Sequence, residues 1–173
     1  MSATHGFAGD GYLLLEQPEK AIDHLEKGLK IHLDLGLKWW SGVFHNSLAL
    51  AHLKLGNLKK AHVHAEKGVS LSRANNERCE EAIAEMHLGM VLGAGGSGLF
   101  DEAREHILRG IRQADELRLK PWTAVGYFYL GELSTSFGRT EESKGHLQRA
   151  EAKFREMGMD DWLGKAQDAL AKL

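Results

Sequence analysis

The chain has 173 residues, of which 27% are charged, and 22 Lys and Arg residues nearly balance 24 Asp and Glu residues. This length indicates one domain, and a net charge of −2 provides no electrostatic attraction to nucleic acid. No apolar run approaches the roughly 18–20 residues that cross a bilayer, so we expect no membrane segment. No Lys or Arg precedes Lys20, and the single cysteine is Cys79, so we expect no secretory signal, no internal disulfide and a cytoplasmic location.

One unit recurs along the whole chain at intervals of 40, 42 and 40 residues. Small residues mark one position of this unit, at Ala21, Ala61, Ala103 and Ser143, and a second position at Gly28, Gly68, Gly110 and Ala150. A third position is occupied by Gly36, Asn76, Arg118 and Gly158, and Gly or Asn there is typical of a helix that ends in a left-handed residue. A fourth, at Glu16, Gly56, Gly98 and Gly138, indicates a tight turn. Arg118 and Glu16 depart from these patterns.

The apolar spacing within each unit is helical, and Pro18 and Pro121 lie where the first turn of a helix tolerates proline. In chain order, this apolar spacing predicts helices over residues 3–15, 18–35, 38–55, 58–74, 76–93, 100–117, 120–137, 140–157 and 160–172. These helices form pairs in units of about 2–37, 38–77, 78–119 and 120–159. The last helix, which begins near Trp162, is expected to be a C-terminal cap over residues 160–173 of a single domain that spans residues 1–173. No segment predicts a strand.

The units resemble the tetratricopeptide repeat (TPR). Its small first-helix residue matches Gly9, Ala49, Gly89 and Gly131, and its preceding leucine matches Leu48, Leu88 and Leu130. The aromatic residue of the TPR pattern is kept only at Tyr12, and each unit is longer than the usual length of about 34 residues. The resemblance implies an all-α, right-handed superhelix of four helix pairs plus the C-terminal capping helix, with the three leucines buried.

No pattern of residues indicates catalysis, a metal or a cofactor, and we expect none of the three. The glycine-rich stretch Gly93–Gly98 follows a predicted helix, whereas a dinucleotide-binding loop must follow a strand. Four histidines share one repeat position, at His24, His64, His106 and His146. Stacked helices separate such positions by about 10 Å, which is too far for one zinc ion. The glycine-rich stretch is therefore interpreted as a turn, and the histidines as structural or surface residues.

The TPR resemblance implies that the first helix of each unit lines an inner groove. Nine residues at a spacing of i, i+3 and i+7 map to that groove, namely Val43, Asn46, Leu50, Ile83, Met86, Met90, Val125, Phe128 and Glu132. Because methionine adapts its shape to apolar partners, we expect a protein-interaction scaffold that binds an apolar or amphipathic peptide segment. An alternative for Val43, Ile83 and Val125 is that they pack between neighbouring helices. The nine residues include no Lys or Arg, which argues against RNA recognition.

Two further possibilities concern the ends of the chain. Residues Phe154–Leu163 resemble the ends of helical-repeat arms in bacterial signalling ATPases and nucleotide cyclases, so a regulatory arm of a larger enzyme is the alternative function. Leu13, Leu14 and Leu15 follow a glycine-rich start that shields them poorly. We therefore expect either more chain upstream or a homodimer through the N-terminal unit, and simple fraying of residues 1–8 is the other interpretation.

Overall fold

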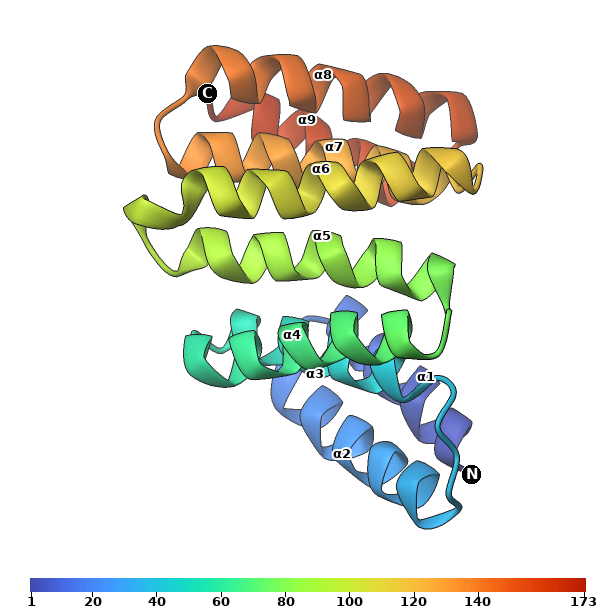
Figure 1. Cartoon of the computed structure of the whole chain (residues 1–173). Coiled ribbons are helices and arrows are strands. Elements are labelled where there is room, and N and C mark those ends of the chain that lie inside the picture. The colour runs from blue at the N-terminus through green and yellow to red at the C-terminus, as the bar shows by residue number, and fades with distance from the viewer.

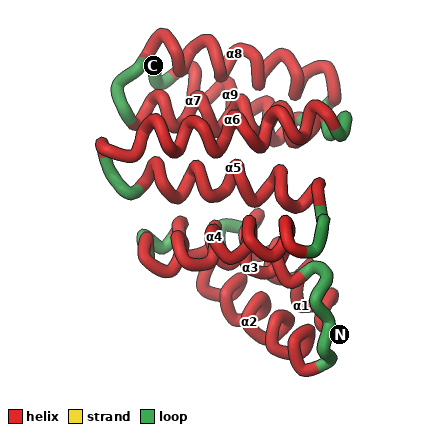
Figure 2. The backbone as a smooth tube through the Cα atoms, in the orientation of Figure 1, coloured by secondary structure: helices red, strands yellow, loops and turns green.

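The protein is all-α. The computed structural model describes the backbone of residues 1–173 and every side chain except that of Ser97. The helices are α1 (Ser2–Leu14), α2 (Pro18–Asp34), α3 (Ser41–Lys54), α4 (Leu58–Ala74), α5 (Arg78–Ala94), α6 (Phe100–Glu116), α7 (Lys120–Ser136), α8 (Thr140–Met157) and α9 (Asp160–Ala171), with a short 3₁₀ turn η1 (Ser97–Leu99) before α6. Within this described chain only helices and loops occur (Figure 2). Each described helix is too short or too polar to span a bilayer.

The helices stack in chain order from α1 and α2 at one end to α8 and α9 at the other, and the two termini lie at opposite ends (Figure 1). The tightest packing is within the hairpins α1–α2, α3–α4, α5–α6 and α7–α8, and α9 packs on α8. The first helices α1, α3, α5 and α7 also contact one another in sequence. The predicted all-α repeat superhelix is therefore confirmed. We call the surface formed by α1, α3, α5, α7 and α9 the inner face.

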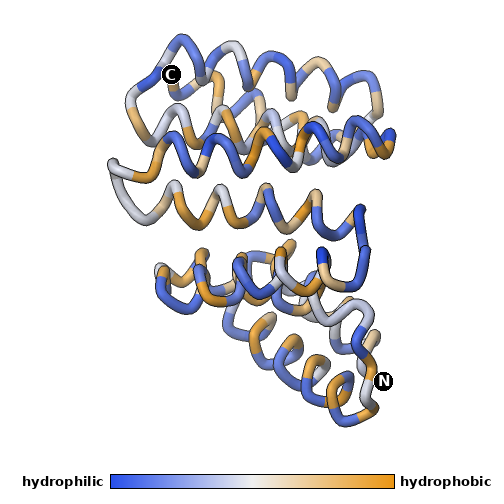
Figure 3. The backbone as a smooth tube through the Cα atoms, viewed as in Figure 1, coloured by the Kyte–Doolittle hydropathy of each residue, from blue (hydrophilic) through white to orange (hydrophobic). Residues whose placement is uncertain are grey.

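Close packing within each hairpin depends on the small residues of the repeat. A Cβ atom added to Gly131 of α7 would lie 2.5 Å from Cγ of Leu147 in α8, and one added to Gly9 would lie 2.5 Å from Cγ of Leu25. The second unit has alanine at both positions, with Ala49 where the other units have glycine and Ala65 where they have Leu25, Ile107 and Leu147. The neighbouring leucines Leu48, Leu88 and Leu130 are buried, as the sequence predicts. Figure 3 shows polar and apolar residues alternating along the helices, as expected when one side of each helix faces the core.

The backbone conformation of each turn depends on its position in the repeat more than on the residue that occupies it. Arg118 has a φ of 58° and Glu16 a φ of 54°, so both adopt the left-handed conformation of the glycines at equivalent positions. At Arg118 the reason is visible, because the N–H of Leu119 donates to the carbonyl of Ala114 at 2.8 Å and closes the last turn of α6. Gly98 is the exception, because Gly96 takes the positive φ in that longer turn. The glycine-rich turn does follow a helix, α5, as predicted.

The helix predicted over residues 38–55 begins only at Ser41, because Trp40 is left-handed with a φ of 66°. The turn between α4 and α5 holds this segment. The Trp40 N–H donates to the Glu77 carboxylate at 2.7 Å, and the Asn75 side chain donates to the carbonyl of Lys38 at 2.8 Å. Contacts from residues 37 positions away therefore decide where α3 starts.

Candidate functional site

Two of the predicted groove residues do not line a groove. Met86 is fully buried, and a Cβ atom added to Gly110 of α6 would lie 2.5 Å from its Cγ. Asn46, which is 3% exposed, lies at the same repeat position and packs on Gly68 of α4. The prediction that these two side chains are presented to a ligand is wrong, because each packs against a glycine in the second helix of its own hairpin. A charged residue at Met86 would consequently test folding and not binding.

The other predicted residues divide by exposure. Val125 is 3% exposed and packs in the core, which agrees with the alternative that it packs between neighbouring helices. Phe128 is nearly buried but still reaches a pocket on the inner face. The remaining predicted side chains are half-buried, and these are Val43, Leu50, Ile83, Met90 and Glu132.

Four of the predicted residues meet in one pocket on the inner face, with a volume of about 280 Å³. We call it the apolar pocket. Side chains from α1, α3, α5, α7 and α9, together with Glu16 beyond the end of α1, line it, namely Leu13, Leu14, Glu16, Leu50, Leu53, Lys54, Met90, Phe128, Tyr129, Glu132, Trp162 and Lys165. The first and the last helix thus border the same pocket, although they lie at opposite ends of the sequence.

An aromatic wall and a few charged groups give the apolar pocket its chemistry. The Phe128 and Tyr129 rings lie 5.6 Å and 6.5 Å from the ring of Trp162 in edge-to-face contact. At the rim, Lys54 forms an ion pair of 2.7 Å with Glu16. Burial raises the pKa of Glu132, and Lys172 offsets part of that increase. The pocket can therefore bury apolar groups while a charged rim orients the polar parts of a ligand.

A second pocket on the inner face has a volume of about 180 Å³ and contains two carboxylates. We call it the acidic pocket. It is lined by Ala3, Gly6, Phe7, Asp10, Leu25, Trp40, Val43, Phe44, Ser47 and Glu80. Of the predicted groove residues it contains Val43, and α3 contributes to both pockets.

One inner-face position was not predicted from the sequence, and it is occupied in the four units by Phe7, Ser47, His87 and Tyr129. Phe7 and Ser47 line the acidic pocket, and Tyr129 lines the apolar pocket. The inner face of α3 runs through Val43, Ser47, Leu50 and Lys54, with an i, i+4 step where the prediction used i, i+3. The repeat register itself could have indicated this position, because three of its four residues are aromatic or histidine.

Histidines serve as contacts within the hairpins. His24, His64, His106 and His146 share one repeat position in the second helix of each unit. Each contacts the residue at one shared position of the first helix, namely His5, His45, Glu85 and Tyr127. In the first two units the contact joins the Nδ1 atoms of His5 and His24 at 3.2 Å and those of His45 and His64 at 2.9 Å. In the last unit the ring of His146 stacks on Tyr127, with 6.3 Å between centroids. Burial lowers the pKa of His45 to about 4. The described residues contain no group of three or more His, Cys, Asp or Glu side chains arranged for a metal ion.

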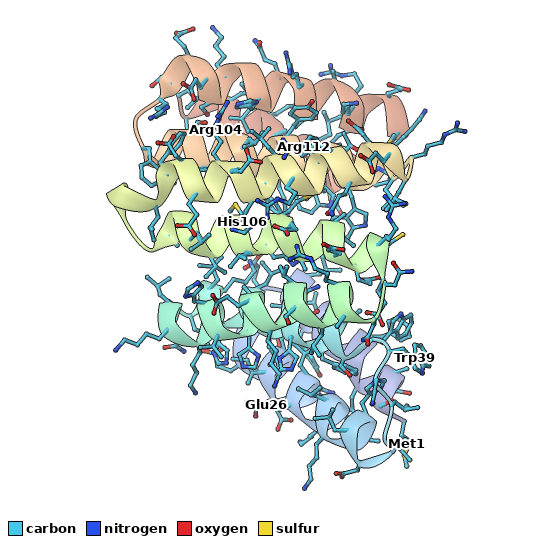
Figure 4. The ribbon with its side chains drawn as sticks, in the orientation of Figure 1. Met1, Glu26, Trp39, Arg104, His106 and Arg112 are labelled. Carbon is cyan, nitrogen blue, oxygen red and sulfur yellow. The ribbon has the colours of Figure 1, made fainter. Side chains whose placement is uncertain are left out.

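In the third unit the partner of the histidine is a buried carboxylate. Glu85 of α5 is fully buried, and the side chain of His106 lies between α5 and α6 (Figure 4), with its Nδ1 2.6 Å from Glu85. Arg73 and Arg109 donate to the same carboxylate at 2.9 Å and 3.2 Å. Burial alone would raise the pKa of Glu85, but the His106 hydrogen bond and the Arg109 charge together lower it. This cluster is a structural link between α4, α5 and α6 and lines neither pocket.

Comparison with known proteins identifies the fold. No protein-family model matches the chain, and no curated protein does. Its structure is similar to that of aspartyl phosphate phosphatase F from Bacillus subtilis, with a TM-score of 0.75 and 15% identity, covering 97% of this chain and 44% of that one. It is also similar to a signal transduction ATPase with numerous domains (a STAND protein) with a tetratricopeptide repeat sensor from Pyrococcus horikoshii, with a TM-score of 0.71 and 16% identity, covering 98% of this chain and 26% of that one.

A third similar structure is that of the nearly identical TPR-like repeats of a putative kinesin light chain from Podosopora anserina, with a TM-score of 0.65 and 16% identity, covering 98% of this chain and 87% of that one. The chain spans less than half the length of the first two proteins. The repeat register, the hairpins and these similarities define a TPR-like helical-repeat fold. At such identities they show the fold alone.

Proposed function

We propose that the chain is a non-enzymatic protein-interaction scaffold that binds an apolar or amphipathic peptide segment on its inner face. The observation that supports this proposal is the apolar pocket, where half-buried Leu50 and Met90 lie beside the aromatic wall of Phe128, Tyr129 and Trp162. Concave pockets with mostly apolar walls and a few charged groups at the rim are typical binding sites. Methionine and aromatic side chains at such a surface fit apolar side chains of a peptide.

We expect the double substitution Leu50→Glu/Met90→Glu to weaken peptide binding at least about tenfold, because two carboxylates would lose their water when an apolar ligand enters. Both side chains are half-buried and line the pocket, and a thermal melt followed by circular dichroism checks that the variant remains folded. The measurement is titration calorimetry with peptides selected on the wild-type protein from a displayed library of random 12-residue sequences.

The matched control is Val63→Glu, which places the same charge at a side chain that is 62% exposed on α4. Selected peptides should bind this variant as they bind the wild type. Equal affinity for the pocket variant and the control would show that the apolar pocket is not the binding site.

We also propose that the N-terminal unit mediates self-association. Its large apolar side chains are unusually exposed, with Leu14 74%, Phe7 67% and Leu35 66% accessible. Trp39, which follows this unit, is 56% exposed and projects outward (Figure 4). Sedimentation equilibrium should therefore show a dimer at high concentration, and Leu35→Glu, at a residue that lines neither pocket, should shift it to monomer. The control is Leu173→Glu at the other end. A strictly monomeric wild type would contradict this prediction.

The alternative function, a regulatory arm of a larger signalling ATPase or cyclase, draws support from one observation. The similarity to the STAND protein with a TPR sensor covers 98% of this chain but only 26% of that protein. An ATPase or cyclase domain in the same reading frame would favour this alternative over an independent scaffold. A reading frame that encodes only the repeats would count against it.

A further inference from the structure

We infer that the acidic pocket binds a basic side chain, arginine or lysine, of the same peptide segment that occupies the apolar pocket. This inference rests on the proposed function and adds a charge requirement to it. The pocket opens on the same inner face and shares helix α3 with the apolar pocket.

The fold places two carboxylates around α3 in this pocket. Asp10 comes from α1 and Glu80 from α5, and both of these helices pack against α3. Ser47 of α3 donates to one oxygen of Asp10 at 2.6 Å, which fixes the orientation of that carboxylate in the pocket. The negative charge is therefore held in place by the fold and not carried on freely moving surface side chains.

These two carboxylates lack a counterion in the part of the chain that the structure describes. No Lys, Arg or His lines the pocket, and neither Asp10 nor Glu80 belongs to an ion pair. Glu16 and Glu85, by contrast, form ion pairs with Lys54 and Arg109. Burial raises the pKa of both pocket carboxylates, and the nearby Glu77 and Asp10 raise that of Glu80 further. An entering cation would relieve this repulsion.

The wall of the acidic pocket favours an organic cation over a metal ion. Phe7 and Trp40 form part of the wall, in edge-to-face contact with 6.5 Å between their centroids. Aromatic faces and carboxylates together attract organic cations, and the flat guanidinium of arginine can stack on a ring while it bonds to a carboxylate. A hard metal ion instead requires a shell of oxygen ligands, which an apolar wall does not supply.

The spacing of the pockets predicts a sequence pattern in the ligand. Val43 in the acidic pocket and Leu50 in the apolar pocket are seven residues apart on α3, which corresponds to about 10 Å. An extended peptide covers this distance in about three residues. The ligand should therefore carry a basic residue about three or four positions from a large apolar residue.

The experiment selects peptides from the random 12-residue library on the wild-type protein and measures their affinities by titration calorimetry. We expect arginine or lysine to be enriched at the predicted spacing from an apolar residue. In the best peptide, replacing arginine by its neutral isostere citrulline, or lysine by norleucine, should weaken binding about tenfold or more. This change leaves the protein intact and so does not depend on the folding of a variant.

The complementary protein variant is Asp10→Asn/Glu80→Gln, which should bind the basic peptide about tenfold more weakly than the wild type does. This variant should bind the basic peptide and its neutral counterpart with equal affinity. It should melt no lower than the wild type, because it removes carboxylates that burial disfavours. The control Asp101→Asn/Glu102→Gln makes the same change of charge at exposed residues of α6 and should bind normally.

The outcomes separate the two proposals. Selected peptides that lose binding to Leu50→Glu/Met90→Glu but show no basic preference would overturn the cation pocket and keep the scaffold function. Equal affinity for the basic and neutral peptides would likewise overturn the cation pocket. If no library peptide binds, or if the apolar-pocket variant binds every peptide normally, the proposed function fails and this inference fails with it.

Discussion

Replacing both His106 and Arg109 by leucine should lower the free energy of unfolding by about 3–5 kcal/mol, because it leaves a buried carboxylate with too few partners. Glu85 is fully buried, whereas His106 and Arg109 are 17% and 40% exposed. In the double variant the buried carboxylate keeps only Arg73, which donates to it at 2.9 Å, and water cannot reach it to replace the two lost partners. Chemical denaturation at neutral pH measures this change, provided that the unfolding transition remains two-state.

The control is a triple variant that adds Glu85→Leu to the double substitution. Because the stranded carboxylate is then absent, the triple variant should recover most of the lost stability. An exposed pair of the same chemistry, Arg112 with Glu105, offers a second comparison, and its loss should cost at most about 1 kcal/mol. A triple variant that is less stable than the double variant would show that Glu85 contributes by packing and not through its charge partners.

Acidification should destabilise the protein well before its exposed carboxylates are protonated. Burial lowers the pKa of both His45 and His87 from 6.5 to about 4. Below pH 6.5 the unfolded chain therefore takes up protons at these rings that the folded chain does not, so the stability falls as the pH falls towards about 4. Each ring accounts for a loss on the order of 3 kcal/mol over that range.

The environment of His87 makes it the better residue for this test. It is 5% exposed, and its ring lies 6.2 Å from that of Trp122 and 6.1 Å from that of Tyr129. Neither ring nitrogen has a hydrogen-bond partner among the described residues, so phenylalanine can replace it without leaving a polar group unpaired. Urea midpoints between pH 7.5 and 5 should fall less steeply for His87→Phe than for the wild type. The control is His62→Phe, which makes the same substitution at a half-exposed ring. Identical slopes for all three proteins would contradict the assignment.

The sequence alone determined the helices, their pairing and the superhelix, because these depend on a local spacing of residues that recurs in four units. The small residues of the repeat, such as Gly89 and Gly131, mark where two neighbouring helices must touch. The register also forced left-handed turns on Glu16 and Arg118, against their preference. Helix periodicity and short turns act within a few residues, and that is why a single sequence reveals them.

Only the tertiary structure decided which side of each first helix faces a ligand. Met86 and Met90 are one helical turn apart, yet the first packs against Gly110 and the second lines the apolar pocket. That difference depends on how far α5 is rotated against α6, which is a property of the packed hairpin. The same holds for the acidic pocket, because Asp10 and Glu80 lie 70 residues apart in the chain and meet only where α1 and α5 both pack on α3.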